Sequence, residues 1–114
     1  MLAVNPFTFL LGKNANQPTI KYFSLQKTSV AYIGSTINLT CKMDNAEVGI
    51  FLKSGVSIRE GGRFTYTFKG YGSNGLEGTL EITNVTEKDE GVFTCFAYKA
   101  GKSDMTTFTL KTGL

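Results

Sequence analysis

The chain has 114 residues, of which 41% are hydrophobic and 18% charged, a composition typical of one folded domain rather than of a disordered segment. Its formal net charge is +3, and its 12 Lys and Arg side chains form no basic run, so no nucleic-acid-binding surface is expected. Histidine is absent and there are two cysteines, which argues against the usual acid–base catalysis and the common zinc sites. We therefore expect neither an enzyme nor a bound cofactor or metal.

Residues 1–17 are expected to form a weakly ordered leader or linker. They begin with MLAVNPFTFLLG, which lacks the basic start of a signal peptide, and they end in the polar stretch KNANQ. No apolar run approaches the ~20 residues that a membrane-spanning helix needs, so no membrane span is expected in this fragment. We place the folded domain at 18–112 and a short tail at 113–114.

From residue 18 onward the hydrophobic pattern is that of β-strands. No segment shows a helical period over ten residues, and polar residues and glycines interrupt the pattern at short intervals. Many short strands of this kind predict an all-β sandwich of two antiparallel sheets. The expected strands are 19–24, 28–32, 35–42, 48–53, 57–60, 63–68, 78–83, 92–98 and 105–111.

The stretch KGYGSNGLEG at 69–78 contains the G-x-G-x-x-G spacing of a dinucleotide-binding turn. That motif works when a helix follows the glycines, because the amides at the helix N-terminus bind the phosphates. Here a strand pattern follows instead, at 78–83. We therefore expect a turn between two strands, with Asn74-Gly75 as its hairpin dipeptide, and no nucleotide binding.

Four stretches, in order along the chain, resemble the strand motifs of immunoglobulin-like domains. DEGVFTC at 89–95 is similar to the D-x-G-x-Y-x-C motif of strand F, and GSTINLTC at 34–41 to the G-x-x-V-x-L-x-C motif of strand B. LEITNV at 80–85 looks like strand E entering the E–F turn, and RF at 63–64 like the start of strand D. The resemblance is closest to the intermediate (I-set) class. It implies a single immunoglobulin-like antiparallel β-sandwich with Greek-key connections.

The resemblance implies a disulfide between Cys41 and Cys95. Both cysteines share the inward side of their strands with Leu39 and Phe93, so they can face each other across the two sheets. The alternative is a pair of free buried thiols, which pack as small hydrophobic side chains in a reducing compartment.

The resemblance also implies structural roles around the E–F turn. Asp89 is expected to pair with Arg63 and to cap the turn, while Gly91 permits the tight entry into strand F. Phe93 occupies the position of the family's corner tyrosine, so the hydrogen bond of that hydroxyl is missing.

The family's core tryptophan is absent, because the chain contains no Trp. Phe51 is the replacement favoured by spacing, whereas strict alternation from Val48 would bury Ile50 and Leu52 instead. The two alternatives stay open at this point.

One sheet face is predicted to be a protein interface. If Cys95 and Phe51 face inward, their neighbours face outward on the sheet formed by family strands G, F and C. Exposed aromatic and aliphatic neighbours on one face indicate an interaction surface, and the resemblance implies that this sheet often mediates adhesion. The alternatives are that a neighbouring domain or the N-terminal segment covers the face, or that the residues are scattered. The predicted interface residues are Phe96, Tyr98, Ile50 and Leu52.

The expected function is an extracellular recognition or adhesion module of a cell-surface or secreted protein. Its partner would be another protein, immunoglobulin-like or not, in a homophilic or heterophilic contact. Two N-x-T sequons make Asn38 and Asn84 glycosylation candidates in that compartment. The alternative is a structural spacer domain of a cytosolic muscle or cytoskeletal protein, in which the cysteines would stay reduced.

Overall fold

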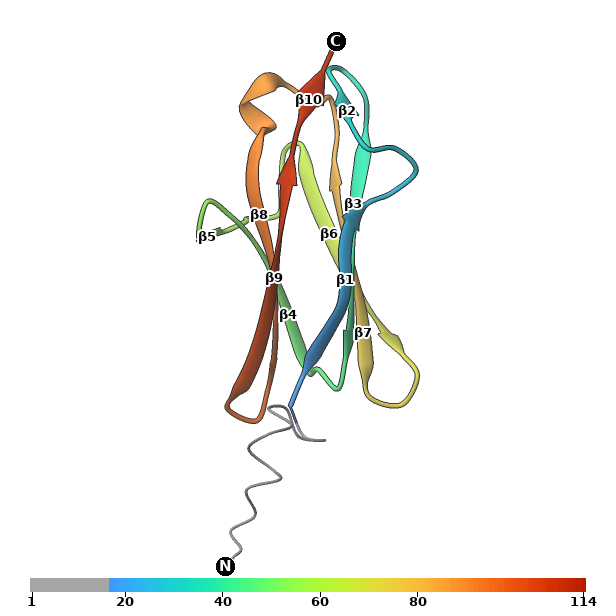
Figure 1. Ribbon diagram of the computed structural model, residues 1–114, viewed down its shortest axis with the longest axis vertical. Helices are drawn as coiled ribbons and strands as arrows, with labels where there is room; N and C mark the ends of the chain where they lie inside the picture. The colour runs from blue at the N-terminus through green and yellow to red at the C-terminus, as the bar shows by residue number, and fades with distance from the viewer. Residues whose placement is uncertain (1–16) are drawn as a thin grey trace, which may run out of the picture.

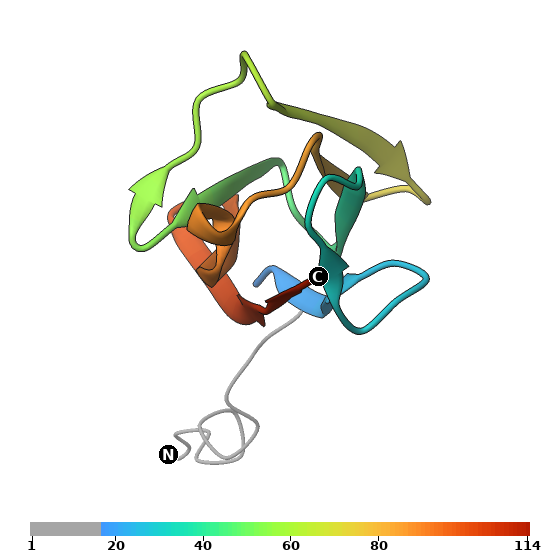
Figure 2. The same cartoon turned by 90° about the horizontal axis from the view of Figure 1, so that it is seen from above.

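Two four-stranded sheets lie face to face in the computed structural model, which describes residues 17–114 (Figures 1 and 2). One sheet has the order β1-β3-β7-β6, formed by Thr19–Leu25, Ile37–Asp44, Gly75–Ile82 and Phe64–Tyr71. The other has the order β5-β4-β8-β9, formed by Val56–Ser57, Val48–Lys53, Gly91–Lys99 and Lys102–Leu110. A short 3-10 helix, η1, covers Glu87–Asp89 between β7 and β8. The predicted all-β sandwich is confirmed.

A third, two-stranded sheet departs from the prediction of antiparallel pairing throughout. β2 (Ala31–Tyr32) pairs in parallel with β10 (Thr112–Gly113). The Ala31 N–H donates to the Lys111 carbonyl at 3.0 Å, and the Ile33 N–H donates to the Gly113 carbonyl at 2.8 Å. Gly113, which was expected in a tail, is therefore part of a strand, because β2 offers it an unpaired edge.

The strand expected at 28–32 shrinks to the two residues of β2 for a local reason. The Thr28 hydroxyl donates to the Val30 carbonyl at 3.0 Å and accepts from the Val30 N–H at 3.2 Å. A threonine side chain that satisfies nearby backbone groups in this way competes with ladder pairing. The segment therefore turns before it pairs.

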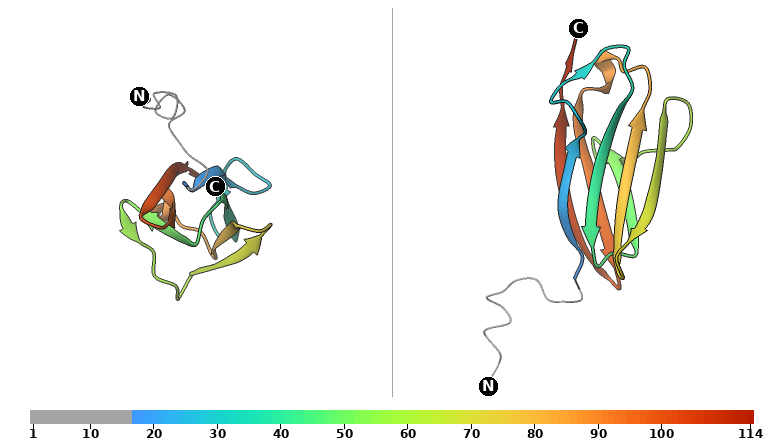
Figure 3. Two further views of the ribbon diagram at one scale, coloured as in Figure 1. Left: turned by 90° about the horizontal axis from the view of Figure 1, so that it is seen from below. Right: turned by 90° about the vertical axis from the view of Figure 1, so that its right-hand side faces the viewer.

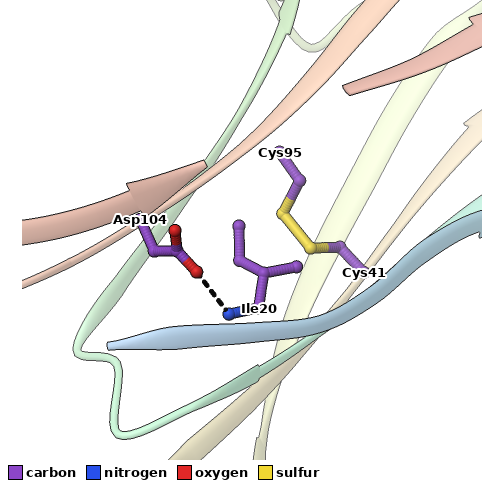
Figure 4. Close-up of a disulfide and its surroundings, with 4 residues drawn as sticks. All are labelled: Ile20, Cys41, Cys95 and Asp104. Carbon is purple, nitrogen blue, oxygen red and sulfur yellow. Dashed lines mark hydrogen bonds between the residues drawn. A yellow bond between two sulfur atoms is a disulfide. The ribbon is translucent and has the colours of Figure 1, made fainter. Parts of the chain in front are cut away.

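The inward residues of the central strands form the core. Successive side chains of a strand point to opposite faces, so alternate residues are buried over 37–43 of β3 and 93–97 of β8. Within this core Cys41 of β3 and Cys95 of β8 form a disulfide that joins the two sheets, with a Cα–Cα distance of 6.5 Å (Figure 4). The predicted disulfide is thus present. The other inward residues are Ile37, Leu39, Met43, Phe93 and Ala97.

A cluster of aromatic rings fills the place of the missing tryptophan. Phe51 is 2% exposed, and its ring centroid lies 5.2 Å from that of Phe68, 5.9 Å from Phe23 and 6.2 Å from Tyr66. Ile50, on the opposite side of β4, is half-buried. Phe51 is therefore the core residue, and several phenylalanines share the volume that one indole would occupy.

The two long sides of the sandwich differ. β1 and β9 close one side, where the Ile20 N–H donates to the Asp104 carboxylate at 2.9 Å (Figure 4). The Phe23 and Phe108 rings also meet edge to face between these strands. On the other side β5 and β6 belong to different sheets. There β6 is the outermost strand of its sheet (Figure 3, right).

Candidate functional site

The outer face of the β5-β4-β8-β9 sheet carries rows of apolar side chains. The register places Val48 opposite Tyr98, and Ile50 opposite Phe96, which in turn faces Met105 on β9. These residues alternate with inward-facing neighbours, so they project from the sheet together. We call this surface the apolar face and define it by Val48, Ile50, Leu52, Val92, Phe96, Tyr98 and Met105.

Side chains of the apolar face are open to solvent to different degrees. The exposed fraction is 58% for Met105, 45% for Val48 and 41% for Tyr98. Phe96, Ile50 and Leu52 are half-buried by their neighbours. The structure thus places all four predicted interface residues on one surface, with Tyr98 the most exposed of them.

Three members of the apolar face were missed by sequence reasoning. Val48 was assigned to the buried side under one alternative, and Val92 and Met105 were not considered. Met105 joins the face because β9 pairs with β8 in a register that puts it beside Phe96. Sequence alternation gives the parity of a strand, but the register between two strands depends on the turn that joins them.

The apolar face contains no charged residue, whereas the outer face of the first sheet does. There the register brings Lys42 of β3 opposite Glu77 of β7, and Glu77 opposite Lys69 of β6. Tyr22 donates from its hydroxyl to Glu77 at 3.2 Å; partial burial, together with this bond, raises the pKa of Tyr22. A sheet face turned to water is normally polar in this way, so the apolar face is the exceptional one.

The E–F turn that leads into β8 is fixed by an ion pair. Arg63 Nη1 and Nη2 donate to the two carboxylate oxygens of Asp89, each at 2.9 Å. The Thr86 N–H donates to the same carboxylate at 2.8 Å. Arg63 Nη1 also reaches the carbonyls of Thr83 and Asn84, at 3.1 and 3.2 Å. The structure therefore brings Arg63 and Asp89 together, as the resemblance implied, and Arg63 ties the turn to the start of β6.

Charge and burial act in opposite directions on Asp89. Burial by itself would raise the pKa of Asp89, but the hydrogen bonds from Arg63 and Thr86 outweigh it, so the pKa lies below its ordinary value. The same side-chain bond raises the pKa of Arg63. Gly91, just beyond this pair, has φ of +139°. Phe93 is fully buried, without a hydroxyl to bond the turn.

The glycine-rich stretch is a hairpin, but a narrower one than expected. β6 and β7 pair as far as Tyr71 and Gly75, so the loop between them is 72–74. Gly72 has a positive φ of +62°, whereas Gly75 lies in β7 and does not. The predicted Asn74-Gly75 turn is therefore wrong in detail, because the left-handed glycine is Gly72, the first residue of the loop.

The two sequons lie away from the apolar face. Asn38 is on β3 in the other sheet, opposite Glu81 of β7. Asn84 is exposed in the E–F turn, in a left-handed conformation with φ of +53°.

Within residues 17–114 no three His, Cys, Asp or Glu side chains are grouped so that they could hold a metal ion. In the same part of the chain no helix has the length and apolar character needed to cross a membrane.

The sandwich, its sheet-bridging disulfide and the ion pair under the E–F turn define an immunoglobulin-like domain. Residues 21–112 match the family model of the immunoglobulin I-set domain, and the chain belongs to this family. No curated protein sequence is significantly similar to it.

Several solved structures share the fold. Titin domain M7 has a TM-score of 0.69 at 22% identity, covering 90% of this chain and 100% of that chain. Titin M4 has a TM-score of 0.69 at 17% identity, covering 88% and 100%. A structure of Dpr2 Ig1-Ig2 in complex with DIP-Theta Ig1-Ig3 has a TM-score of 0.71 at 19% identity, covering 83% and 32%. Likeness at these identities establishes the fold.

Proposed function

We propose that this domain is a protein-recognition module that binds another protein through the apolar face, and that it has no enzymatic activity. The observation that carries the proposal is the three-strand surface from Val48 to Met105 that contains apolar side chains and no charge. The strands that form this surface, β4, β8 and β9, pair as continuous ladders, and the disulfide anchors the central strand β8. Such a surface is pre-organised, so binding orders few additional groups.

An extracellular or cell-surface location is part of the proposal. A disulfide between Cys41 and Cys95 is stable in an oxidising compartment, and both sequons are placed on parts of the domain outside the apolar face. The second candidate is a structural spacer of a cytosolic muscle or cytoskeletal protein, favoured by the similarity to titin domains. Homophilic and heterophilic contacts both fit a recognition module.

A photo-cross-linking experiment tests the apolar face in the parent protein expressed in its native cells. A photoreactive phenylalanine analogue at Met105 should capture a partner, because this side chain is the most exposed of the face. The matched control places the analogue at Ser24, which is exposed on the outer side of β1. Equal capture from both positions would contradict a dedicated interface.

Substitutions on the face should weaken that capture without unfolding the domain. Phe96→Ala and Tyr98→Ala should each reduce capture from position 105, because aromatic anchors often cost ~2 kcal/mol or more on truncation. Their melting temperatures should stay close to that of the unmodified protein. Phe93→Ala is the stability control, with an expected loss of roughly 3–5 kcal/mol from a core cavity. Unfolding by Phe96→Ala to the same extent would show a core role instead.

A further inference from the structure

Beyond its first residue, Phe64, the strand β6 pairs within residues 17–114 with β7 alone. The residue that precedes β6 shows which of its backbone groups bond to β7. The Thr83 N–H donates to the Arg63 carbonyl at 2.9 Å. In an antiparallel ladder the residues that exchange hydrogen bonds with the partner strand alternate with residues that do not. Thr65, Thr67 and Lys69 therefore bond to β7, while the residues between them direct their N–H and C=O groups away from β7.

The chain itself uses the upper end of this open edge. The Gly61 N–H donates to the Phe64 carbonyl at 2.8 Å, and the Phe64 N–H donates back to the Gly61 carbonyl at 3.1 Å, which makes an antiparallel bridge. Below this bridge the next outward-directed groups belong to Tyr66, Phe68 and Gly70. Within residues 17–114 these three make no backbone hydrogen bond on that side.

The same edge has an apolar lining. Tyr66 and Phe68 are half-buried, and their rings pack on the core and on each other, with centroids 5.9 Å apart. Ile58, in the segment that joins β5 to β6, is also half-buried and packs against the core. Val56 on β5 is 68% exposed. A strand added to β6 would turn every second side chain toward these residues.

Other long edges of the sandwich are protected. The backbone of β1 is engaged at Ile20 by the Asp104 carboxylate, and β1 lies beside β9. β2 is paired by β10, and β5 has two residues. β6 has eight residues and neither a proline nor a bulge in its pairing with β7. Proteins commonly block an exposed sheet edge with a covering segment, a short edge strand, a proline or a bulge.

We propose that β6 binds an extended segment of a partner protein as an added antiparallel strand, continuing the bridge that Gly61 begins. The segment carries apolar side chains opposite Tyr66 and Phe68. It carries an acidic side chain near Lys69, which is exposed on the outer face of β6. Hydrogen bonds between the two backbones supply the affinity, and every second side chain of the added segment supplies the selectivity, as in other cases of strand addition.

A second copy of this chain is a poorer occupant of the edge. In a two-fold pairing centred on Phe68, each Tyr66 would face Gly70 of the other copy. The Lys69 side chains of both copies would then project from the same face on adjacent strands, within two residues of each other. Like charges at such positions oppose pairing, whereas an acidic residue on a partner strand is attracted.

The probe is a synthetic peptide of about nine residues that alternates valine with threonine and glutamate, a length typical of a strand. It is titrated into the complete 114-residue protein, labelled with ¹⁵N. We expect saturable shifts of the Tyr66, Phe68 and Gly70 amides, together with slower exchange of their protons with solvent. The absence of such shifts up to about 1 mM peptide, or shifts centred on the apolar face, would overturn the proposal.

Two variants at one position separate edge pairing from other effects. Gly70→Pro removes one outward N–H and should weaken peptide binding by roughly tenfold. Gly70→Ala keeps the N–H, and a Cβ there would have no neighbour within 4 Å, so binding should be unchanged. If Gly70→Pro binds as tightly as Gly70→Ala, the peptide is not paired with β6.

A charge reversal gives a test that does not depend on proline. Lys69→Glu should weaken binding of the glutamate-containing peptide. It should strengthen binding of a matched peptide in which lysine replaces glutamate. Equal affinity of both peptides for both proteins would contradict the proposed placement of Lys69. Concentration-dependent broadening of the β6 amides without peptide would identify a second copy as the occupant and refute the proposal.

Discussion

Asp89 shows how one side chain can hold a turn that lacks its usual hydrogen bond. In this chain Phe93 has no hydroxyl to bind the backbone of the E–F turn. The turn is instead connected through Asp89, which accepts from Arg63 and from the Thr86 N–H. The two-pronged contact with Arg63 fixes geometry as well as charge, which a lysine could not do in the same way.

The lowered pKa of Asp89 predicts a particular loss of stability in acid. The folded-state pKa of Asp89 is below its unfolded value of about 4. The ionised carboxylate therefore contributes its full stabilisation of the fold when the pH is above the unfolded-state pKa. This stabilisation is lost as the pH falls through the folded-state pKa. The free energy of unfolding, measured by urea titration between neutral pH and about pH 2, should therefore fall in this range.

Asp89→Asn is the matched variant for this measurement. At neutral pH it should be less stable by about 1–2 kcal/mol, because a neutral amide accepts weaker hydrogen bonds than a carboxylate, while solvent screens the partly exposed Arg63 guanidinium. Its stability should then change less with acid than that of the unmodified protein. Parallel pH profiles for the two proteins would show that Asp89 is not the titrating group.

At the residue scale, the sequence predicted which charged residues pair, but not which side chain fills the place of the missing tryptophan. The contact between Asp89 and Arg63 could be expected because the resemblance to immunoglobulin-like domains implies it, although the two residues lie 26 positions apart. The choice between Phe51 and Ile50 could not be made, since both parities satisfy alternation in a short strand. The structure decides it because Phe51 meets rings from β1 and β6, which are distant in sequence.

Strands β4 and β7 each carry a glycine that makes room for a ring of β6. A Cβ at Gly49 or at Gly78 would collide with Cε1 of Phe68. The two atoms would lie far inside van der Waals contact, so Phe68 would have to move. The two glycines therefore set how closely Phe68 can approach Phe51 between the sheets.

Gly78→Ala should destabilise the domain by about 2 kcal/mol through overpacking of Phe68. Gly70→Ala is the control, because its Cβ would enter open space and it should be neutral or slightly stabilising. Thermal or urea unfolding of both variants gives the comparison. Equal stability would mean that Phe68 is free to leave the cluster.

At the element scale, long strands were easier to predict than short ones. The range of β4 matches the expected 48–53, and β3, β8 and β9 lie within a few residues of their predictions. β2 and β5 have two residues each and depend on neighbours for their pairing, so local alternation could not define them. The parallel partner of β2 comes from the opposite end of the domain, which no local signal reveals.

The disulfide links elements 54 residues apart and constrains the whole molecule. On the loop-entropy model, a closed loop of this size stabilises the folded state by about 4 kcal/mol. Urea unfolding with and without a reductant should therefore differ by about this amount. A variant with Cys41→Ala and Cys95→Ala should be insensitive to the reductant. If the unmodified protein also ignores the reductant, the thiols are not bonded in solution.

The lack of charge on the apolar face has a consequence for how fast and under which conditions a partner could bind there. Coulombic steering accelerates encounter when charges line the contact, and salt suppresses it. Binding through the apolar face should instead proceed without steering, with an association rate nearly independent of ionic strength. Rate measurements from low to high salt would then separate this face from the mixed charges on the outer face of the opposite sheet.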